Sequence, residues 1–224
     1  MTIHEHHLTV ARTARYFTLG EPGPEVEDVW FVCHGYGQLA KHFIRHFEPI
    51  ASSRRLIVAP EALSRFYLES PNTPARDRRV GATWMTREDR LAEIEDQIAY
   101  LDALHAQTLG ELSGPEPRVR VLGFSQGVAT VMRWIVHGSA RPHDLVLWAG
   151  SVPPELELGA HQARLAAVRL ALVVGTHDEY ASWAALDEQR ARFESHGLSA
   201  RALTFDGGHH LDANLLARLA DEPA

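Results

Sequence analysis

Six short apolar runs alternate with amphipathic stretches along the chain, and this alternation limits the fold more than any other feature. The runs are 29–33, 55–59, 118–124, 144–150, 169–175 and 200–205. Apolar residues at helical spacing fill 88–109, 126–137 and 183–196. Because parallel strands need crossover connections, this alternation predicts an α/β fold with a mostly parallel central sheet and helices on both faces.

The expected helices have sequence signals at their ends. For 88–109 we expect Thr86 and Asp89 as a capping pair and Gly110 as the stop, and for 183–196 we expect Gly197 as the stop. The buried stripe of 88–109 is expected to contain Leu91, Ile94, Ile98, Leu101 and His105.

The remaining segments have less regular patterns. Residues 8–19 predict an opening strand or hairpin, because they are rich in β-branched and aromatic residues. Residues 60–86 form the longest irregular segment, and this length predicts a loop at the active site. The whole chain, 1–224, is expected to be a single domain.

Composition excludes several classes of protein. Apolar residues make up 45% of the chain and the formal net charge is −7, so nucleic acid is not expected as a partner. The 14 histidines are scattered without metal-ligand spacing, and we expect no metal ion. No apolar run approaches the ~18 residues of a membrane span and no signal-peptide pattern occurs, so we expect a cytoplasmic protein. We expect it to be a monomer or a homodimer. The single cysteine, Cys33, is expected to end a buried strand.

Two interpretations fit the stretch VWFVCHGYGQLAKHF. Gly35, Gly37 and Ala40 match a relaxed dinucleotide-binding fingerprint, with Glu61 in the place of the ribose-binding acid. The same glycines also suit an oxyanion hole, in which backbone N–H groups point at developing negative charge.

The stretch VRVLGFSQGVATVMRWIV, residues 119–136, favours the second interpretation. It contains G-x-S-x-G centred on Ser125, between a predicted strand and a predicted helix. A nucleophile elbow needs this context, because the serine must project from a sharp, strained turn. We therefore predict Ser125 as the nucleophile, with the backbone N–H groups of Tyr36 and Gln126 as oxyanion donors.

An acid and a base follow Ser125 in the order that this architecture requires. Asp178 comes directly after the strand at 169–175, and His209 and His210 follow Gly207 and Gly208 after the strand at 200–205. We predict Asp178 as the orienting acid and His209 as the base, because the glycine pair lets that loop cross the strand ends. His210 remains the alternative base, and Asp206 is the competing acid.

These residues resemble the α/β-hydrolase superfamily, and within it the phospholipase/carboxylesterase family, which includes bacterial carboxylesterases and acyl-protein thioesterases. The motifs that carry the resemblance are CHGYGQ, VAPE, GFSQG, GTHDE and GGHH. The resemblance implies hydrolysis of esters or thioesters through an acyl-enzyme intermediate on Ser125, with no cofactor and little or no cap domain.

Residues 60–86 are expected to shape the substrate pocket, with Tyr36, Phe66, Tyr67, Trp84 and Met85 as candidate walls. We predict short or medium acyl groups in a small-molecule ester or thioester. Arginines of this loop could instead bind an anionic substrate, although pairing with nearby carboxylates is favoured. The alternative functions are a hydrolase-fold ligand receptor or interaction protein without turnover, and an amidase or peptidase on the same scaffold.

Overall fold

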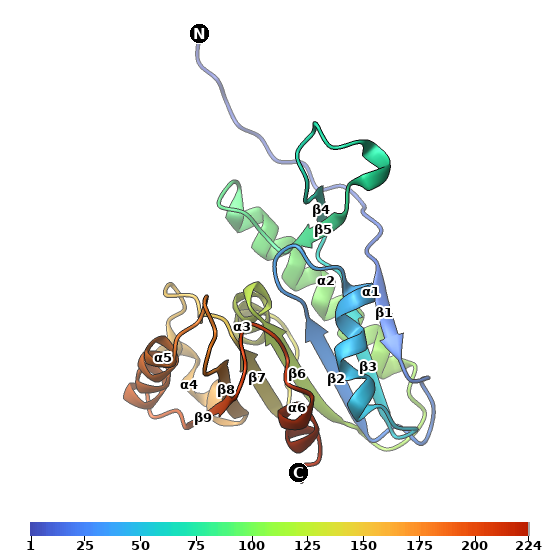
Figure 1. Ribbon diagram of the computed structural model, residues 1–224, viewed down its shortest axis with the longest axis vertical. Coiled ribbons are helices and arrows are strands. Elements are labelled where there is room, and N and C mark those ends of the chain that lie inside the picture. The colour runs from blue at the N-terminus through green and yellow to red at the C-terminus, as the bar shows by residue number, and fades with distance from the viewer. Residues whose placement is uncertain (224) are drawn as a thin grey trace.

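The computed structural model describes residues 1–223 and contains a central seven-stranded sheet in the order β1-β3-β2-β6-β7-β8-β9 (Figure 1). Strand β1 pairs antiparallel with β3 at one edge, and the other neighbours in the sheet are parallel. The strands of this sheet are β1 Tyr16–Leu19, β2 Asp28–Cys33, β3 Arg55–Pro60, β6 Arg118–Phe124, β7 Asp144–Trp148, β8 Arg169–Gly175 and β9 Ala200–Phe205.

Helices cover both faces of the sheet, as the alternation of strands and helices predicts (Figure 1). The helices are α1 Ala40–Phe43, α2 Arg90–Gly110, α3 Gln126–His137, α4 Gln162–Ala166, α5 Trp183–Ser195 and α6 Ala213–Ala220. Three short 3₁₀ helices are also present, η1 Ile44–Ile50, η2 Ala75–Asp77 and η3 Leu158–His161. Among the described residues, none of the helices combines the length and the apolar character needed to cross a bilayer.

Strand β2 shows why the apolar runs are continuous. All of its residues are buried, with Phe31 packing among the side chains of α2 and α3, and Trp30 packing against η1 on the opposite face. Successive side chains of a strand point to opposite faces, so a strand covered on both sides needs apolar residues at nearly every position. Each of the six predicted runs is confirmed as a parallel strand of the sheet.

Some local expectations were wrong. The opening strand contains only Tyr16–Leu19, and residues 8–15 have no regular structure. Helix α2 begins after Asp89, whose side chain makes no capping bond and whose backbone is left-handed with φ 45°. In the expected stripe Leu91 is 67% exposed, whereas Gln97 is buried, so the buried face of α2 is rotated relative to the predicted one.

The segment 60–86 is more ordered than its sequence suggested. It contains an antiparallel hairpin formed by β4 Ser64–Tyr67 and β5 Val80–Thr83, which lies beyond the carboxyl end of the parallel strands (Figure 1). Backbone bonds from Gly37 N–H to Ala82 O (2.9 Å) and from Ala82 N–H to Gln38 O (3.2 Å) join this hairpin to the loop after β2. The hairpin is therefore part of the wall around the strand ends.

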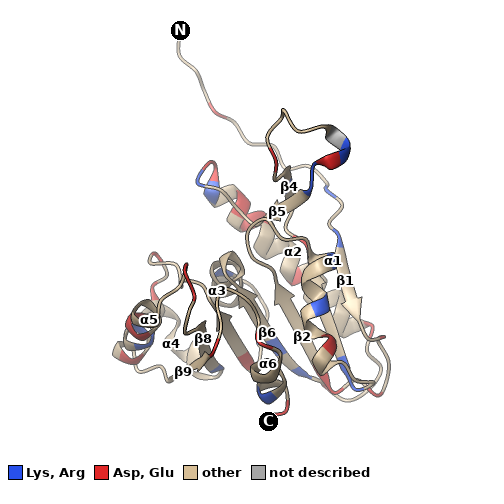
Figure 2. Cartoon of the chain, viewed as in Figure 1, with Lys and Arg blue, Asp and Glu red and all other residues tan. Residues whose placement is uncertain are grey.

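Charged residues occupy helices, loops and strand starts, while the middles of the central strands are mostly uncharged (Figure 2). At the amino ends of the strands, Arg118, Arg120 and Arg169 donate hydrogen bonds to backbone carbonyls within 219–223. Arg118 and Arg169 also bind Asp144, which is buried. These contacts hold the segment after α6 against the base of the sheet.

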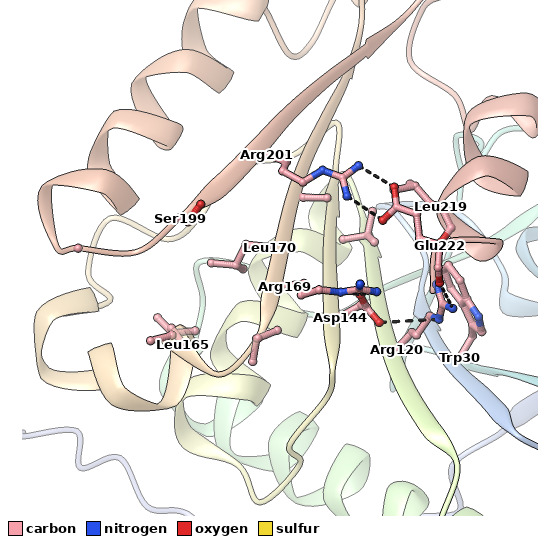
Figure 3. Close-up of a pocket in the computed structure, with 15 residues that line it drawn as sticks. Trp30, Arg120, Asp144, Leu165, Arg169, Leu170, Ser199, Arg201, Leu219 and Glu222 are labelled. Atoms are coloured by element: carbon pink, nitrogen blue, oxygen red, sulfur yellow. Dashed lines mark hydrogen bonds and ion pairs between the residues drawn. The ribbon is translucent and has the colours of Figure 1, made fainter. Parts of the chain in front are cut away.

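Beside this cluster lies a cavity of about 380 Å³, into which Arg120, Arg169 and Arg201 project (Figure 3). Each of these guanidinium groups already has an acidic partner, and the pair between Arg201 and Glu222 uses both carboxylate oxygens. The cavity lies at the amino ends of the strands. Because β6 contains seven residues, the length of that strand, about 20 Å, separates this end from Ser125.

Candidate active site

Ser125 occupies a sharp turn between β6 and α3. Its backbone has φ 54° and ψ −117°, a conformation that non-glycine residues rarely adopt. Gly123 and Gly127 make the turn sterically possible, because a Cβ on Gly123 would lie 2.4 Å from Gly127 O and one on Gly127 would lie 2.2 Å from Cys33 O. The side chain of Ser125 is thereby presented at the carboxyl end of the sheet.

The structure brings Ser125, His209 and Asp178 together in a hydrogen-bonded row. His209 Nε2 lies 3.0 Å from Ser125 Oγ, and His209 Nδ1 lies 2.9 Å and 3.0 Å from the two carboxylate oxygens of Asp178. The side chain of Asp178 is fully buried and also accepts hydrogen bonds from the backbone N–H groups of Tyr180 and Ala181. These bonds orient the carboxylate, so that His209 Nδ1 faces Asp178 and Nε2 faces Ser125 Oγ.

The competing residues lie elsewhere. Asp206 has a side chain that is 92% exposed and pairs with His177, whose ring is also exposed. His210 packs its ring against Phe205, with ring centroids 5.3 Å apart, and its carbonyl accepts a hydrogen bond from the indole of Trp148. His210 lies in the loop before the last helix, which starts at Ala213 with Asp212 as its N-cap.

The ring of His209 is held from two sides. Phe124 lies with its ring centroid 5.0 Å away, and Tyr180 lies 4.9 Å away. Tyr180 is 82% exposed, so it forms an open rim of the site rather than part of the core.

The loop after β2 lies directly against the nucleophile. A Cβ on Gly35 would be 3.1 Å from Ser125 Cβ, and Gly37 has a left-handed φ of 74° that lets the loop turn at this point. Among the hydrogen bonds of residues 1–223, the backbone N–H groups of Tyr36 and Gln126 donate to no protein acceptor. Both groups are therefore free to donate to a ligand beside Ser125.

His34 is a site residue that sequence reasoning missed. Its ring is completely buried, Nδ1 donates to Gly35 O at 2.8 Å, and Nε2 accepts from the backbone N–H of Ala62 at 3.1 Å. Burial lowers the pKa of His34, although the bond to Gly35 and the charge of Glu61 act in the opposite direction. A neutral imidazole thus braces the loop that carries Tyr36, and the only sequence signal was its position between a buried strand and a glycine.

The predicted pocket walls divide into two groups. Tyr36 and Phe66 lie with ring centroids 5.1 Å apart, and Tyr36 is 61% exposed at the rim. Tyr67 is also exposed and lies under the guanidinium of Arg78. Trp84, by contrast, is only 2% exposed and donates its indole N–H to His34 O, so its ring belongs to the core and not to a pocket wall.

Met85 also differs from the expected wall residue. Its sulfur lies 3.1 Å from a guanidinium nitrogen of Arg133, and its backbone carbonyl accepts a hydrogen bond from the side chain of Gln126. A cavity of about 40 Å³ lies between the ends of β7 and β8 and the start of α5, with Gly150, Tyr180 and Ala181 among its walls.

The geometry of Glu61 does not favour the alternative interpretation of this region as a dinucleotide-binding site. Glu61 is buried and pairs with Arg15 and Arg65, although one of its oxygens, Oε2, has no hydrogen-bond partner. Burial disfavours the charged form of Glu61, but its bonds to the two arginines outweigh this effect and lower its pKa. The carboxylate is therefore engaged within the protein and not presented to a ribose.

Other loop residues are similarly engaged. Arg76 and Arg79 pair with Asp77 and Glu69, as expected for solvated loop arginines. Within residues 1–223, one group of side chains has metal-ligand spacing, and all of its members are exposed: Glu5, His7 and Asp89.

We compared the sequence and the structure of the chain with those of known proteins. No family profile matches the chain, and no curated protein matches its sequence. Among solved structures, esterase PE8 has a TM-score of 0.65 and 21% identity, covering 93% of this chain and 97% of its own. Acyl-protein thioesterase 2 of Zea mays has a TM-score of 0.70 and 15% identity, covering 93% and 96%.

A phospholipase/carboxylesterase from Dyadobacter fermentans has a TM-score of 0.68 and 14% identity, and the match covers 96% of this chain and 99% of that one. The match thus spans nearly the full length of each of these solved structures. The parallel sheet, the helices on both of its faces and these likenesses together show that the chain has the α/β-hydrolase fold.

Proposed function

We propose that this protein is a serine hydrolase of carboxylic esters or thioesters. The observation that carries the proposal is the hydrogen-bonded row from Asp178 through His209 to Ser125, with the serine in strained geometry at a strand-to-helix turn. A ligand-binding serine needs neither a buried acid nor a histidine 3.0 Å from its oxygen. Those two features are what a hydroxyl needs to become a nucleophile.

The proposed reaction has two stages. Ser125 Oγ attacks the carbonyl carbon while His209 Nε2 takes its proton, and the negative oxygen that forms accepts hydrogen bonds from the N–H groups of Tyr36 and Gln126. Collapse of this intermediate expels the alcohol or thiol, which receives the proton from His209, and leaves an acyl group on Ser125. Water then attacks the acyl group by the same sequence of proton transfers. Asp178 stabilises the imidazolium in both stages.

Two observations support ester or thioester substrates with short or medium acyl groups. The similar solved structures include an esterase, an acyl-protein thioesterase and a carboxylesterase. The cavity beside the site, about 40 Å³, has room for only a few water molecules and not for a long acyl chain, and the rim near Tyr36 and Tyr180 is open.

The test is active-site labelling with a fluorophosphonate, read as intact mass. The wild type is expected to gain one adduct, Ser125→Ala none, and His209→Ala an adduct only very slowly. His210→Ala is the matched control, because this neighbouring histidine packs against Phe205 instead of Ser125. A folded wild type that gains no adduct would refute the proposal and favour a ligand receptor without turnover.

Substrate class is tested with p-nitrophenyl esters of increasing acyl length, matched thioesters and a matched anilide. We expect ester and thioester turnover that declines at long acyl chains. Turnover that rises steadily with chain length would contradict the acyl preference, and faster cleavage of the anilide would favour the amidase alternative.

A further inference from the structure

We propose that the side chain of Gln126 is a positioning residue that fixes the spacing between the two oxyanion donors. It does so through residues 81–85, here called the clamp segment, which bind both the loop carrying Tyr36 and the first residue of α3. This inference rests on the proposed function and assigns to a side chain a role separate from that of its own backbone N–H.

The amide of Gln126 is fully engaged by the clamp segment. Its Oε1 accepts a hydrogen bond from the backbone N–H of Trp84 at 3.1 Å. The hydroxyl of Thr83 has two acceptors within reach of its single hydrogen, Gln126 Oε1 at 3.2 Å and Met85 O at 3.0 Å. Gln126 Nε2 donates to Thr83 Oγ1 and to Met85 O, both at 2.9 Å. One side chain thus uses donors and acceptors on three consecutive residues, and Thr83 is itself buried.

The other side of the clamp segment holds the oxyanion loop. Ala82 exchanges backbone bonds with Gly37 and Gln38 of this loop, as described above. The indole of Trp84 also donates to His34 O at 2.8 Å. The approach at Gly81 is too close for any side chain, because a Cβ there would lie 2.5 Å from Gly37 O. The loop and the clamp segment are therefore in direct backbone contact.

These contacts place one rigid segment between two donors that come from different elements. Tyr36 belongs to the loop after β2, and Gln126 belongs to α3. Oxyanion stabilisation requires both N–H groups within hydrogen-bond distance of the same oxygen, and a displacement of ~1 Å in such a site can lower the rate by ~10²-fold. The bonds of the Gln126 amide link the first residue of α3 to the clamp segment, and Arg133 makes a second contact further along α3, through the sulfur of Met85.

The first variant is Gln126→Ala, which keeps the backbone N–H and removes only the amide. We expect kcat for p-nitrophenyl acetate to fall by roughly 10-fold to 100-fold with little change in KM, because the altered spacing affects the transition state more than substrate binding. The control is Gln107→Ala on α2, whose amide bonds Tyr16 and Glu111 instead, and which should retain wild-type kinetics.

A second pair of variants separates positioning from general destabilisation. Thr83→Val keeps the shape of the side chain and loses the contacts of its hydroxyl with Gln126, whereas Thr83→Ser keeps the hydroxyl. We expect Thr83→Val to lower kcat and Thr83→Ser to restore most of it. In the double variant of Gln126→Ala with Thr83→Val, the two losses should not add, because each removes the same link.

The diagnostic readout is the ratio of rates for an ester and its thiono analogue, in which sulfur replaces the carbonyl oxygen and accepts hydrogen bonds poorly. Loss of donor spacing should lower this oxygen-to-sulfur ratio, and destabilisation elsewhere should not. A wild-type ratio in both Gln126→Ala and Thr83→Val, with wild-type kcat, would overturn the inference while leaving the proposed function intact. A wild type with neither turnover nor labelling would overturn both.

Discussion

Substitution of Gly127 by alanine should favour helix α3 locally but create a steric clash between α3 and the end of β2. Gly127 is the second residue of α3, where alanine is intrinsically the better helix former by up to about 1 kcal/mol. The tertiary structure leaves no room for it, however. The added Cβ would lie 2.2 Å from Cys33 O and 2.9 Å from His34 O, which belong to the end of β2 and the loop that follows it.

The size of the effect follows from these distances. The Cβ would need to withdraw by roughly 1 Å to reach an ordinary contact. Its neighbours are backbone atoms at the end of the central strand β2, which cannot rotate away as a side chain could. Overpacking of this kind costs about 3 kcal/mol at the upper end of its usual range, so after the helical gain we expect a net destabilisation of about 2 kcal/mol. The same displacement would move Ser125 and Gln126 away from the oxyanion loop and lower kcat by ~10²-fold.

The assay combines urea unfolding with ester hydrolysis and fluorophosphonate labelling. The matched control is Gly110→Ala, another glycine at a helix end, where a Cβ would meet nothing within 4 Å. We expect Gly110→Ala to be neutral or slightly stabilising with unchanged activity. If Gly127→Ala were as stable and as active as Gly110→Ala, the reasoning that close packing of α3 on β2 positions the nucleophile would be wrong.

Further predictions concern the acids, a buried base and the thiol. Asp178→Asn should lower kcat by ~10⁴-fold with little loss of fold, whereas Asp206→Asn should leave kcat unchanged, and a large loss in Asp206→Asn would reverse the assignment. Because burial lowers the pKa of His34, its stabilising effect is complete above about pH 6.5 and is lost as the pH falls below that value. Urea unfolding between about pH 7.5 and about pH 5.5 should therefore show a larger loss of unfolding free energy in the wild type than in His34→Gln, and equal losses would count against this account. Burial also raises the pKa of the Cys33 thiol, so iodoacetamide should leave the native protein unmodified by intact mass, and rapid alkylation before unfolding would contradict the buried position.

The parallel strands could be predicted from the sequence because of their burial on both faces. A run such as 29–33 has no polar residue to interrupt it, and the breaks between runs contain glycines, prolines or charged residues. The row of Ser125, Asp178 and His209 was predictable for a related reason. In a parallel sheet the residues that follow the strands lie at one edge, so strand order along the chain already placed these side chains together.

The hairpin in 60–86 could not be predicted by the same reasoning. Its strands are four residues long, and β4 is half exposed. Strand β5 is stabilised by backbone bonds to the loop at Gly37, a contact that no local pattern encodes. Trp84 was misassigned for this reason, since an aromatic residue in a loop looks like a pocket wall until its partner, His34, is known. The buried face of α2 was also misjudged, because Gln97 is polar and yet faces inward.

The separation of the site residues along the chain has a consequence for folding kinetics. Ser125 and His209 are 84 residues apart in sequence, and their contact exists only when β6, β7, β8 and β9 have paired in register. Pairings of this range are slow to form, because a large loop must close before any contact compensates for the lost chain entropy. During refolding, the helical circular-dichroism signal should therefore return well before Ser125 regains its reactivity towards the fluorophosphonate. The rate at which that reactivity returns would report the rate at which the sheet is completed.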